Sequence, residues 1–410
     1  MTEDKIITIT AFDQEIGKFG YDLDKGQSFF QYNPDFLSSG QYLNLFPFIF
    51  KRTKKVQVFT EFQNDSFQGL PPMIADSLPD TFGNIIFQEW LKSRGIHKIS
   101  PLEKLAYVSN RGMGALEYKP AKNIPNTSTI QMDEVIEILK KVLKLKGQTT
   151  GKNLDELSLL HVFKIGTSAG GLRPKILISE HKKTGEIIAG DIETSDVYRH
   201  YLVKLNLEES DAYNKEKVEY VYYLLAQKAS IDIMPSKIID DRHFATLRFD
   251  RQRGEKQHVM SATGLTGWDY KSEPENSTYE NLFKLALNLK VPHCQLQQLF
   301  KRMAFNVIFK NIDDHLKNHS FIYDKENNTW HLAPAYDLTF ALNPLLTYKK
   351  TSRALSVNGK RTDIKTEDLL SVANEFAIKN PKAIINDLKL LTSKWIEVAK
   401  EHKIPEFIIK

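Results

Sequence analysis

The chain has 410 residues, of which 41% are hydrophobic and 26% are charged, so it is long enough for two or three globular domains. Lys and Arg outnumber Asp and Glu by 56 to 51, and the resulting net charge of +5 is too small to indicate nucleic-acid binding over the whole surface. The single cysteine, Cys294, excludes an internal disulfide and a cysteine-rich zinc site.

The first residues do not show the basic and then apolar pattern of a secretion signal. The longest mostly apolar run, Tyr42 to Phe50, is about half of the ~20 residues that are needed to cross a bilayer. We therefore expect a cytoplasmic protein without a membrane partner.

Residues 1 to about 75 alternate short β-rich pieces, such as Ile6 to Ile9 and Val56 to Phe59, with Gly, Pro, Asn and Asp turn residues. This pattern predicts antiparallel strands and hairpins. Pro79 and Asp80 then precede apolar residues at helical spacing, which predicts a helix that covers the sheet.

The stretch from Lys119 to Thr129 is rich in Pro, Asn, Ser and Thr, and it predicts a linker. An apolar stripe that begins at Met132 predicts an amphipathic helix that ends at Gly147. Between Phe163 and Phe249 the pattern predicts strands, with one helix near Glu216 to Ala229. The expected strands are Lys175 to Ser179, Ile187 to Ala189 and His200 to Leu205.

Beyond His258 the chain becomes mainly helical, because four segments show apolar periodicity or strong helix formers. These segments are Asn281 to Leu289, Leu296 to Phe309, Asp368 to Phe376 and Pro381 to His402. We therefore predict three domains, namely a β-rich module over 1–120, a strand-rich lobe over 130–255 and a helical lobe over 256–410.

The densest group of chemically capable side chains runs from Asn311 to Asn318, between an apolar helix and the strand-like Phe321 to Tyr323. Such a loop suits phosphoryl transfer, because the Asp313 carboxylate can orient an attacking hydroxyl while the Asn318 amide oxygen helps to hold Mg²⁺. Asp337, in a second short segment downstream, adds another carboxylate. The alternative is an ordinary solvated turn capped by an asparagine.

A glycine-rich segment from Gly166 to Lys175 has the composition of a phosphate-binding loop, because glycines allow backbone N–H groups to approach an anion. An ordinary hairpin turn has the same composition, and the segment matches neither the Walker A pattern nor the protein-kinase glycine loop. Lys204 follows on a predicted strand, where an inward lysine is costly unless it meets an anion. Glu219, on the next predicted helix, either pairs with Lys204 as in protein kinases or faces solvent.

These motifs together resemble the HipA family of bacterial toxin serine/threonine kinases. The likeness is carried by five ordered features, namely Thr167 to Lys175, the strand ending at Lys204, Arg248 to Arg251, Asp313 to Asn318, and Tyr336 with Asp337. The family's N-terminal module is similar to four further segments, Phe30 to Tyr32, Tyr42 to Phe48, Leu78 to Asp80 and Gly112 to Leu116, so we expect a full-length member.

The resemblance implies an α+β, protein-kinase-like fold of two lobes, of the type shared by HipA and phosphoinositide kinases, with an antiparallel β-rich N-terminal module and a helical C-terminal lobe. It also implies that Asp313 is the catalytic base and that Asn318 and Asp337 hold Mg²⁺. Ser168 falls at the family's autophosphorylated serine, and Thr167 is a second candidate. The residues implied to bind ATP are Gly170, Gly171, Leu172, Arg173, Pro174, Lys175, Lys204, Leu247, Arg248, Phe249, His315, Lys317 and Tyr336.

The partners implied by the resemblance are a helix-turn-helix antitoxin of the HipB type, DNA reached through that antitoxin, and a protein substrate that is an aminoacyl-tRNA synthetase. A phosphate on Ser168 would repel the phosphates of ATP, so we expect autophosphorylation to inactivate the enzyme. Two alternatives remain open, namely a kinase of lipids or small molecules, and a binding protein that acts as a corepressor with the antitoxin on DNA.

A basic segment surrounds the predicted turn at Asn358 and Gly359. Solvated hairpin lysines explain this segment more simply than a site for tRNA, DNA or an acidic protein surface. Its basic residues are Lys349, Lys350, Arg353, Lys360, Arg361 and Lys365.

Overall fold

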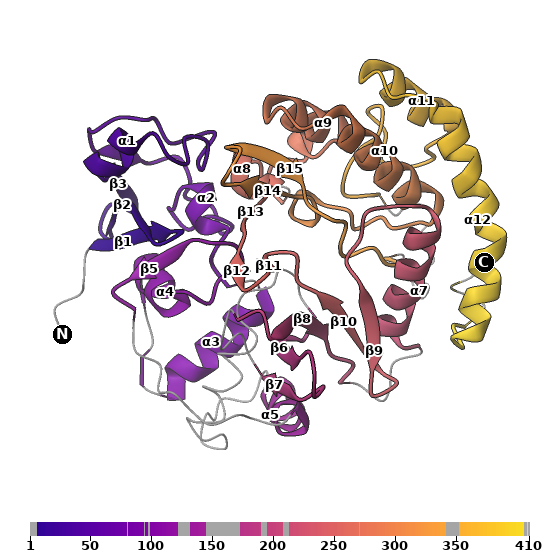
Figure 1. The fold of residues 1–410 in the computed structure, drawn as a ribbon, viewed down its shortest axis with the longest axis horizontal. Helices are drawn as coiled ribbons and strands as arrows, with labels where there is room; N and C mark the ends of the chain where they lie inside the picture. Colours follow the sequence, from indigo (N-terminus) through magenta and orange to yellow (C-terminus); the bar gives the residue numbers. More distant parts are fainter. Residues whose placement is uncertain are drawn as a thin grey trace. The chain divides into compact units, whose positions relative to one another are not determined.

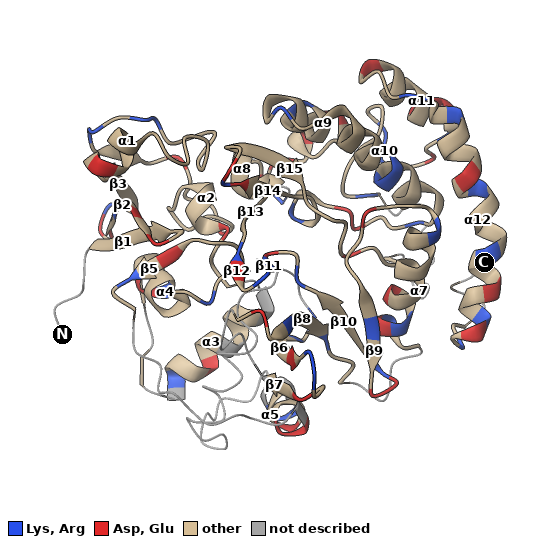
Figure 2. Cartoon of the chain, in the orientation of Figure 1, with Lys and Arg blue, Asp and Glu red and all other residues tan. Residues whose placement is uncertain are grey.

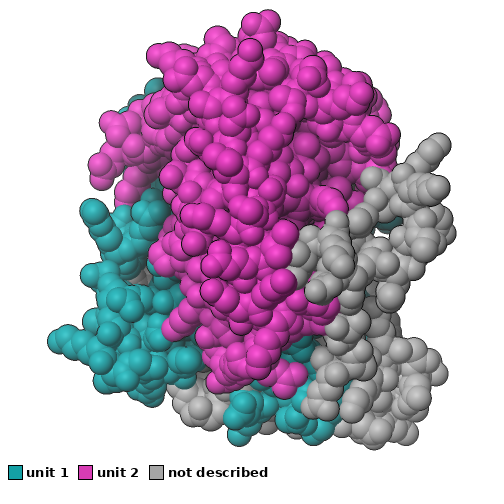
Figure 3. Space-filling view, turned by 90° about the vertical axis from the view of Figure 1, so that its right-hand side faces the viewer, with its two compact units in different colours: residues 1–207, 245–260, 264–267 teal, residues 208–244, 261–263, 268–410 magenta. Residues whose placement is uncertain are grey.

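The structure is a computed structural model (Figure 1). Its chain forms two compact units (Figure 3). The described residues are 6–79, 81–93, 95–96, 99–121, 132–144, 173–189, 195–207, 213–269, 271–341, 352–405 and 408. The first unit contains residues 1–207, 245–260 and 264–267, and the second contains residues 208–244, 261–263 and 268–410. The bounds of the three predicted domains remain predictions.

The first unit begins with a five-stranded antiparallel sheet in the order β4-β3-β2-β1-β5. Ile7, Ile9, Phe19 and Phe30 are buried on one face, because alternate residues of a strand point to the same side. The strands are β1 (Ile6–Ala11), β2 (Gln14–Asp22), β3 (Gln27–Tyr32), β4 (Gln57–Phe59) and β5 (Glu117–Lys119). The antiparallel sheet predicted for this part of the chain is therefore confirmed.

Four helices accompany this sheet in the first unit. The predicted helix after Asp80 is present, but the sequence analysis missed the helix that starts at Pro101, although Ser100 and Glu103 form a capping box before it. The Ser100 hydroxyl accepts a hydrogen bond from the Glu103 backbone N–H at 3.1 Å. The helices are α1 (Pro34–Ser39), α2 (Pro72–Ala75), α3 (Thr81–Ser93) and α4 (Pro101–Val108).

Four strands of a second, five-stranded sheet lie in the order β7-β6-β8-β10. The predicted strands over 175–179, 187–189 and 200–205 are confirmed with small shifts at their ends. The elements are α5 (Met132–Lys144), β6 (Lys175–His181), β7 (Ile187–Ala189), β8 (Tyr198–Lys204), β10 (His243–Leu247), β11 (Arg251–Gln252), β12 (Glu255–Lys256), β13 (His258–Ser261) and α8 (Ala262–Thr266). The predicted end of α5 at Gly147 lies outside the described residues.

The second unit is mainly helical, as the periodicity predicts for the last third of the chain. Helix α12 packs against α7 and α10. The ring centroids of Trp395 and Tyr222 are 5.2 Å apart. Figure 2 shows Lys and Arg interspersed with Asp and Glu along α12, so this helix carries no stripe of a single charge. The elements are α7 (Lys215–Lys228), β9 (Ser236–Ile239), η1 (Pro274–Asn276), α9 (Tyr279–Asn288), α10 (His293–Ile308), η2 (Leu316–Asn318), β14 (Ser320–Asp324), β15 (Thr329–Leu332), α11 (Thr366–Glu375) and α12 (Pro381–Glu401).

No helix among the described residues is both long and apolar enough to cross a membrane.

Candidate active site

The loop from Asn311 to Asn318 joins the C-terminal end of α10 to β14. Its last residues form the short 3₁₀ turn η2, in which the Asn318 N–H donates to the His315 carbonyl at 2.8 Å. The Asn318 side-chain Nδ2 donates to the Asp313 carbonyl at 2.9 Å. Because the nitrogen of this amide bonds within the loop, its Oδ1 is the atom that suits a cation.

Two consecutive aspartates in this loop have opposite surroundings. The Asp313 side chain is exposed, whereas Asp314 is buried and accepts a hydrogen bond from the Tyr279 hydroxyl at 2.6 Å. Asp314 also forms an ion pair with Arg353. Burial together with the nearby negative charge of Asp314 raises the pKa of Tyr279 well above its usual value, so this hydroxyl remains a donor. Asp313 is the aspartate that an incoming molecule can reach.

Asp337 lies a few residues beyond β15, in the left-handed region with φ of 57°. Aspartate adopts this conformation more readily than most non-glycine residues. The Asp337 carbonyl accepts a hydrogen bond from Asn311 Nδ2 at 3.4 Å, and this bond connects its backbone with the start of the loop. The segment that carries Asp337 is therefore fixed against the loop that carries Asp313.

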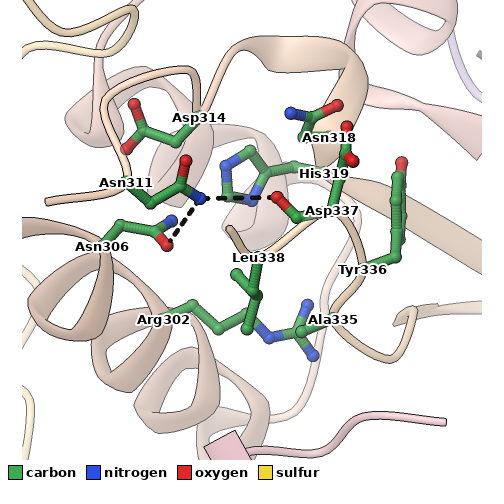
Figure 4. A pocket seen from close by; sticks show the side chains of 10 residues that line it. All are labelled: Arg302, Asn306, Asn311, Asp314, Asn318, His319, Ala335, Tyr336, Asp337 and Leu338. Atoms are coloured by element: carbon green, nitrogen blue, oxygen red, sulfur yellow. Dashed lines mark hydrogen bonds between the residues drawn. The ribbon is translucent and has the colours of Figure 1, made fainter. Parts of the chain in front are cut away.

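These segments line a small pocket that is open to solvent (Figure 4). In this view the side chains of Asn318 and Asp337 lie on the same side of the pocket, and Asp314 lies on another. Buried Arg302 and Asn311 also line it, and Arg302 Nε and Asn311 Oδ1 have no hydrogen-bond partner. The complete lining is Arg302, Asn306, Asn311, Asp314, Asn318, His319, Ala335, Tyr336, Asp337 and Leu338.

The donor set of this pocket fits a magnesium ion bound together with phosphates. Among the residues that the structure describes, no three His, Cys, Asp or Glu side chains gather in a way that could hold a metal. Mg²⁺ needs fewer, because it keeps several waters and takes one or two protein ligands plus oxygens of a substrate phosphate. The Asn318 amide oxygen and the Asp337 carboxylate are ligands of the required type.

Three predicted ATP-binding residues of the second unit lie in or beside this loop. The Tyr336 hydroxyl donates to the Lys317 carbonyl at 2.6 Å and lies 2.6 Å from the Ser320 hydroxyl. Burial lowers the pKa of His315, although the negative charges of Asp313 and Asp337 oppose this shift. His315 is therefore within electrostatic range of both carboxylates, and the Tyr336 hydroxyl binds the backbone at Lys317.

In the first unit, Lys175 and Lys204 are directly opposite each other on the antiparallel strands β6 and β8. Both lysines are buried, with 2% and 9% of their surfaces exposed. Side chains opposite each other on neighbouring strands are about 5 Å apart, and like charges in such a pair repel. The predicted phosphate-binding residue Lys204 therefore lies beside a second buried lysine, at the end of the glycine-rich segment.

The predicted hinge residues Leu247, Arg248 and Phe249 lie at the end of β10. The Arg248 N–H donates to the His200 carbonyl at 2.9 Å, and its guanidinium binds Asp250 at 2.8 and 2.9 Å. The Arg248 side chain is therefore part of a buried ion cluster, and contact between this segment and adenine remains a prediction.

Several predicted residues of the glycine-rich loop lie outside the described residues, namely Thr167, Ser168, Gly170, Gly171 and Leu172. The structure describes this loop only from its end, where Arg173 and Pro174 are half-buried and the Pro174 carbonyl accepts a hydrogen bond from Leu205 N–H at 2.9 Å. The roles predicted for all of these residues remain predictions.

One alternative from the sequence analysis is wrong. Glu219 is 3% exposed, so it does not face solvent, and its pairing with Lys204 remains a prediction. The predicted turn at Asn358 and Gly359 is present, and Lys360 and Lys365 are exposed as expected for solvated lysines, whereas Arg353 of the same segment is 4% exposed. Lys349 and Lys350 lie outside the described residues.

Sequence reasoning missed the role of the buried residues that form a hydrogen-bonded network with the loop or line the pocket, namely Tyr279, Arg302, Asn306 and Arg353. Asn306 Nδ2 donates to the Tyr279 hydroxyl at 3.0 Å, and Asn311 Nδ2 donates to Asn306 Oδ1 at 3.1 Å. A partial signal existed for Arg302 and Asn306, because both are polar residues within the otherwise apolar face of a predicted helix. Nothing local to the sequence indicates that Tyr279 and Arg353 bind Asp314.

Two family models match the sequence. The HipA-like C-terminal domain matches residues 167–395, and the HipA N-terminal domain matches residues 7–119. None of the curated proteins matches the chain.

The fold is similar to that of a chain in the Shewanella oneidensis MR-1 toxin–antitoxin system HipA, HipB and operator DNA complex. The TM-score is 0.67 at 18% identity, and the match covers 98% of this chain and 94% of that chain. A second structure, the Helicobacter pylori proinflammatory kinase CtkA, has a TM-score of 0.31 at 11% identity and covers 49% of this chain and 89% of that one. The first match confirms the predicted α+β, HipA-like fold.

Proposed function

The chain belongs to the HipA family, and from this premise we propose that it is an ATP- and Mg²⁺-dependent serine/threonine-protein kinase, the toxin of a toxin–antitoxin system in the cytoplasm. One observation carries the proposal. An exposed aspartate, Asp313, is held by a buried network beside a pocket that contains Asn318 and Asp337. A phosphotransferase needs a reachable carboxylate next to oxygen ligands for a phosphate-bound cation.

In this proposal Asp313 orients the hydroxyl of the substrate and accepts its proton as the oxygen attacks the γ-phosphorus. ADP leaves as the bond between the γ-phosphorus and the bridging oxygen breaks. Asn318 and Asp337 would hold Mg²⁺, which neutralises charge on the phosphates when it is bound. Lys317, His315 and the other polar groups of the loop then surround the transferred group.

The nucleotide would be bound chiefly by residues of the first unit. The buried Lys175 and Lys204 supply the positive charge for the phosphates, and the backbone of Leu247 to Phe249 receives the adenine ring. The loop from Gly170 to Lys175 covers the phosphates in the same proposal. The position of Lys204 opposite Lys175, the last residue of the glycine-rich segment, supports this assignment.

Autophosphorylation of Ser168 is the self-inactivation step of this proposal. The Ser168 Oγ attacks the γ-phosphorus, its proton passes to a carboxylate base, and ADP is released. The product carries about −1.5 to −2 charges at neutral pH in the loop that binds ATP phosphates. Like-charge repulsion then excludes ATP from the modified enzyme.

The proposed partners are a HipB-like antitoxin, DNA through that antitoxin, and an aminoacyl-tRNA synthetase as the phosphorylated protein. The similarity to a chain from a HipA, HipB and operator DNA complex supports the first two. It also favours the second candidate function, a corepressor that works with the antitoxin on DNA. The two functions are compatible in one protein.

The proposal is tested by incubating the purified protein with ATP and Mg²⁺, followed by intact-mass measurement and peptide mapping. We expect one phosphate on the peptide that contains Ser168, none after chelation of Mg²⁺, and none in the Ser168→Ala variant. Labelling that is the same with and without Mg²⁺ would contradict the proposal. Growth arrest by the wild-type chain but not by the Asp337→Ala variant would link the chemistry to toxicity.

A further inference from the structure

Asp314 is buried beside the exposed Asp313, and the proposed chemistry gives it no role. Its Oδ2 accepts a hydrogen bond from Tyr279 at 2.6 Å and pairs with Arg353, while its Oδ1 accepts from the Leu355 N–H at 3.5 Å. All three donors lie outside the loop. We propose that Arg353 is a positioning residue, which fixes the loop carrying Asp313 through its ion pair with Asp314; the inference rests on the proposed kinase function.

The segment that carries Arg353 holds the loop on both sides of Asp313. Before Asp313, the Ala354 N–H donates to the Ile312 carbonyl at 2.8 Å, and the Arg353 guanidinium lies 3.5 Å from the Asn311 carbonyl oxygen. After Asp313, the same guanidinium pairs with Asp314. The backbone of Asp313 is therefore confined from its neighbours, while its own carboxylate remains exposed.

Arg353 is itself held from several directions. Its N–H donates to the Arg361 carbonyl at 3.0 Å, and its carbonyl accepts from the Arg361 guanidinium at 3.1 Å. Arg361 donates in turn to the Ser277 carbonyl at 3.0 Å, just before α9. The Arg353 guanidinium carbon lies 5.9 Å from the centre of the Tyr279 ring, within the range of a cation–π contact. The basic segment thus contains two arginines that serve as internal supports.

The chemistry of this site favours arginine over lysine. Both contacts are made by one guanidinium nitrogen, Nη2, whose two N–H groups are fixed in the plane of the guanidinium, so that this single nitrogen serves the Asp314 carboxylate and the Asn311 carbonyl together. A lysine keeps the charge but loses this planar arrangement. Because reacting groups must be aligned closely, a misplacement of the loop by about 1 Å can lower the rate about 10²-fold.

The test compares Arg353→Lys with Lys360→Ala in the otherwise unchanged full-length protein. Lys360 lies in the same basic segment but is half exposed and pairs with Asp368, not with the loop. For Arg353→Lys we expect kcat to fall about 10- to 100-fold with KM for ATP changed less than about twofold, since positioning acts on the transition state. For Lys360→Ala we expect both constants to be unchanged.

Tyr279→Phe is the second, milder variant, in case Arg353→Lys folds poorly. It removes one donor to Asp314 but keeps the ring beside Arg353. We expect a smaller fall in kcat than in Arg353→Lys, again with an unchanged KM. Wild-type kcat in both folded variants would overturn the proposal.

Amide hydrogen exchange gives a readout that does not depend on phosphotransfer. We expect residues 311–319 to exchange at least about 10-fold faster in Arg353→Lys than in the wild type, while amides of α12 are unchanged and Lys360→Ala matches the wild type throughout. Unchanged exchange in 311–319 would overturn the proposal. If the wild type transfers no phosphate at all, the kinase function fails, and the exchange result still decides whether Arg353 fixes the loop.

Discussion

Asp250 in the first unit and Asp314 in the second are both buried and both bound to arginine, but they serve regions of different kinds. Asp250 is bound by two arginines, Arg248 and Arg251, and accepts a further hydrogen bond from the Gly114 N–H at 3.0 Å. Arg251 also donates to the carbonyl oxygens of Gly112 and Gly114. This cluster joins two segments that are far apart in the sequence.

The Asp314 network ends one residue away from an exposed carboxylate. Asp250 has no comparable neighbour, since Phe249 and Arg251 are both buried. Two similar buried Asp–Arg pairs therefore serve different purposes. The pair around Asp250 serves the stability of the fold, while the pair around Asp314 serves the geometry of the loop that carries Asp313.

The largest expected effect is on activity, without a change in stability. Asp313→Asn removes the base but leaves an exposed side chain of the same size, so the free energy of unfolding should change by less than about 0.5 kcal/mol. Phosphotransfer should fall about 10³-fold, the usual contribution of a general base. Single-turnover assays and urea titrations of the same preparation measure both quantities. An Asp313→Asn variant that unfolds more easily but transfers phosphate normally would show that Asp313 serves the stability of the fold and not catalysis.

The next effect is on stability. Asp250→Asn leaves two buried arginines without their carboxylate, and breaking such a buried pair lowers the free energy of unfolding by about 3–5 kcal/mol. Urea unfolding followed by circular dichroism measures this loss, and Asp313→Asn is the matched Asp-to-Asn control. A midpoint equal to that of the wild type would show that the cluster does not stabilise the first unit.

The Asp250 ion cluster and a buried histidine of the same unit, His258, should lose their contributions to stability in different pH ranges. Burial lowers the pKa of His258 to about 4, against about 6.5 in an unfolded chain. The unfolded chain therefore binds the extra proton first, and stability should fall by about 3 kcal/mol as the pH drops from 6.5 to 4. Burial opposes ionisation of Asp250, but Arg248 and Arg251 hold its pKa well below the usual range, so its contribution is lost only in stronger acid, below an unfolded value of about 3.9.

Unfolding measured between pH 7 and 4 tests this order of events. His258→Gln should remove the part of the pH dependence of the free energy of unfolding that His258 contributes. Asp250→Asn should instead lower the free energy of unfolding at every pH in this range. His319, whose pKa burial lowers to about 3, should contribute a slope of the same sign in both variants. If the free energy of unfolding of His258→Gln depends on pH as in the wild type, other groups cause the acid sensitivity.

The smallest effect should come from an exposed ion pair. Lys284 in α9 lies 3.8 Å from Glu375 in α11, and both side chains are about half exposed. Solvent and salt screen such pairs, so Lys284→Ala should lower the free energy of unfolding by about 0.5 kcal/mol or less. A loss comparable with that of Asp250→Asn would mean that burial is not what distinguishes the clusters.

The sequence was sufficient to predict the elements whose side-chain pattern is strong. The apolar stripe of α10, which ends at Ile308, and the alternation in β8, which ends at Lys204, were both found near their observed bounds. Those two elements position the predicted loop and the predicted lysine. The α+β fold followed from the order of the motifs and the family that they resemble.

Contacts between distant residues could not be predicted. Arg353 looked like one cation of a solvated turn, because no local pattern marks a partner 39 positions away. The cross-strand pairing of Lys175 with Lys204 depends on the register of β6 and β8, which the sequence does not specify. The capping box at Ser100, by contrast, is a local sequence signal that marks the start of α4.

The most direct test of the central claim is transfer of the γ-phosphate of labelled ATP to protein in the presence of Mg²⁺, with the wild type and Asp313→Asn compared at equal measured occupancy by ATP. Each enzyme is assayed alone and with a bacterial extract as the source of protein substrates. The account predicts labelled protein with the wild type and about 10³-fold less with Asp313→Asn. Equal labelling by the two enzymes, or no labelling by a wild type that binds ATP, would contradict it.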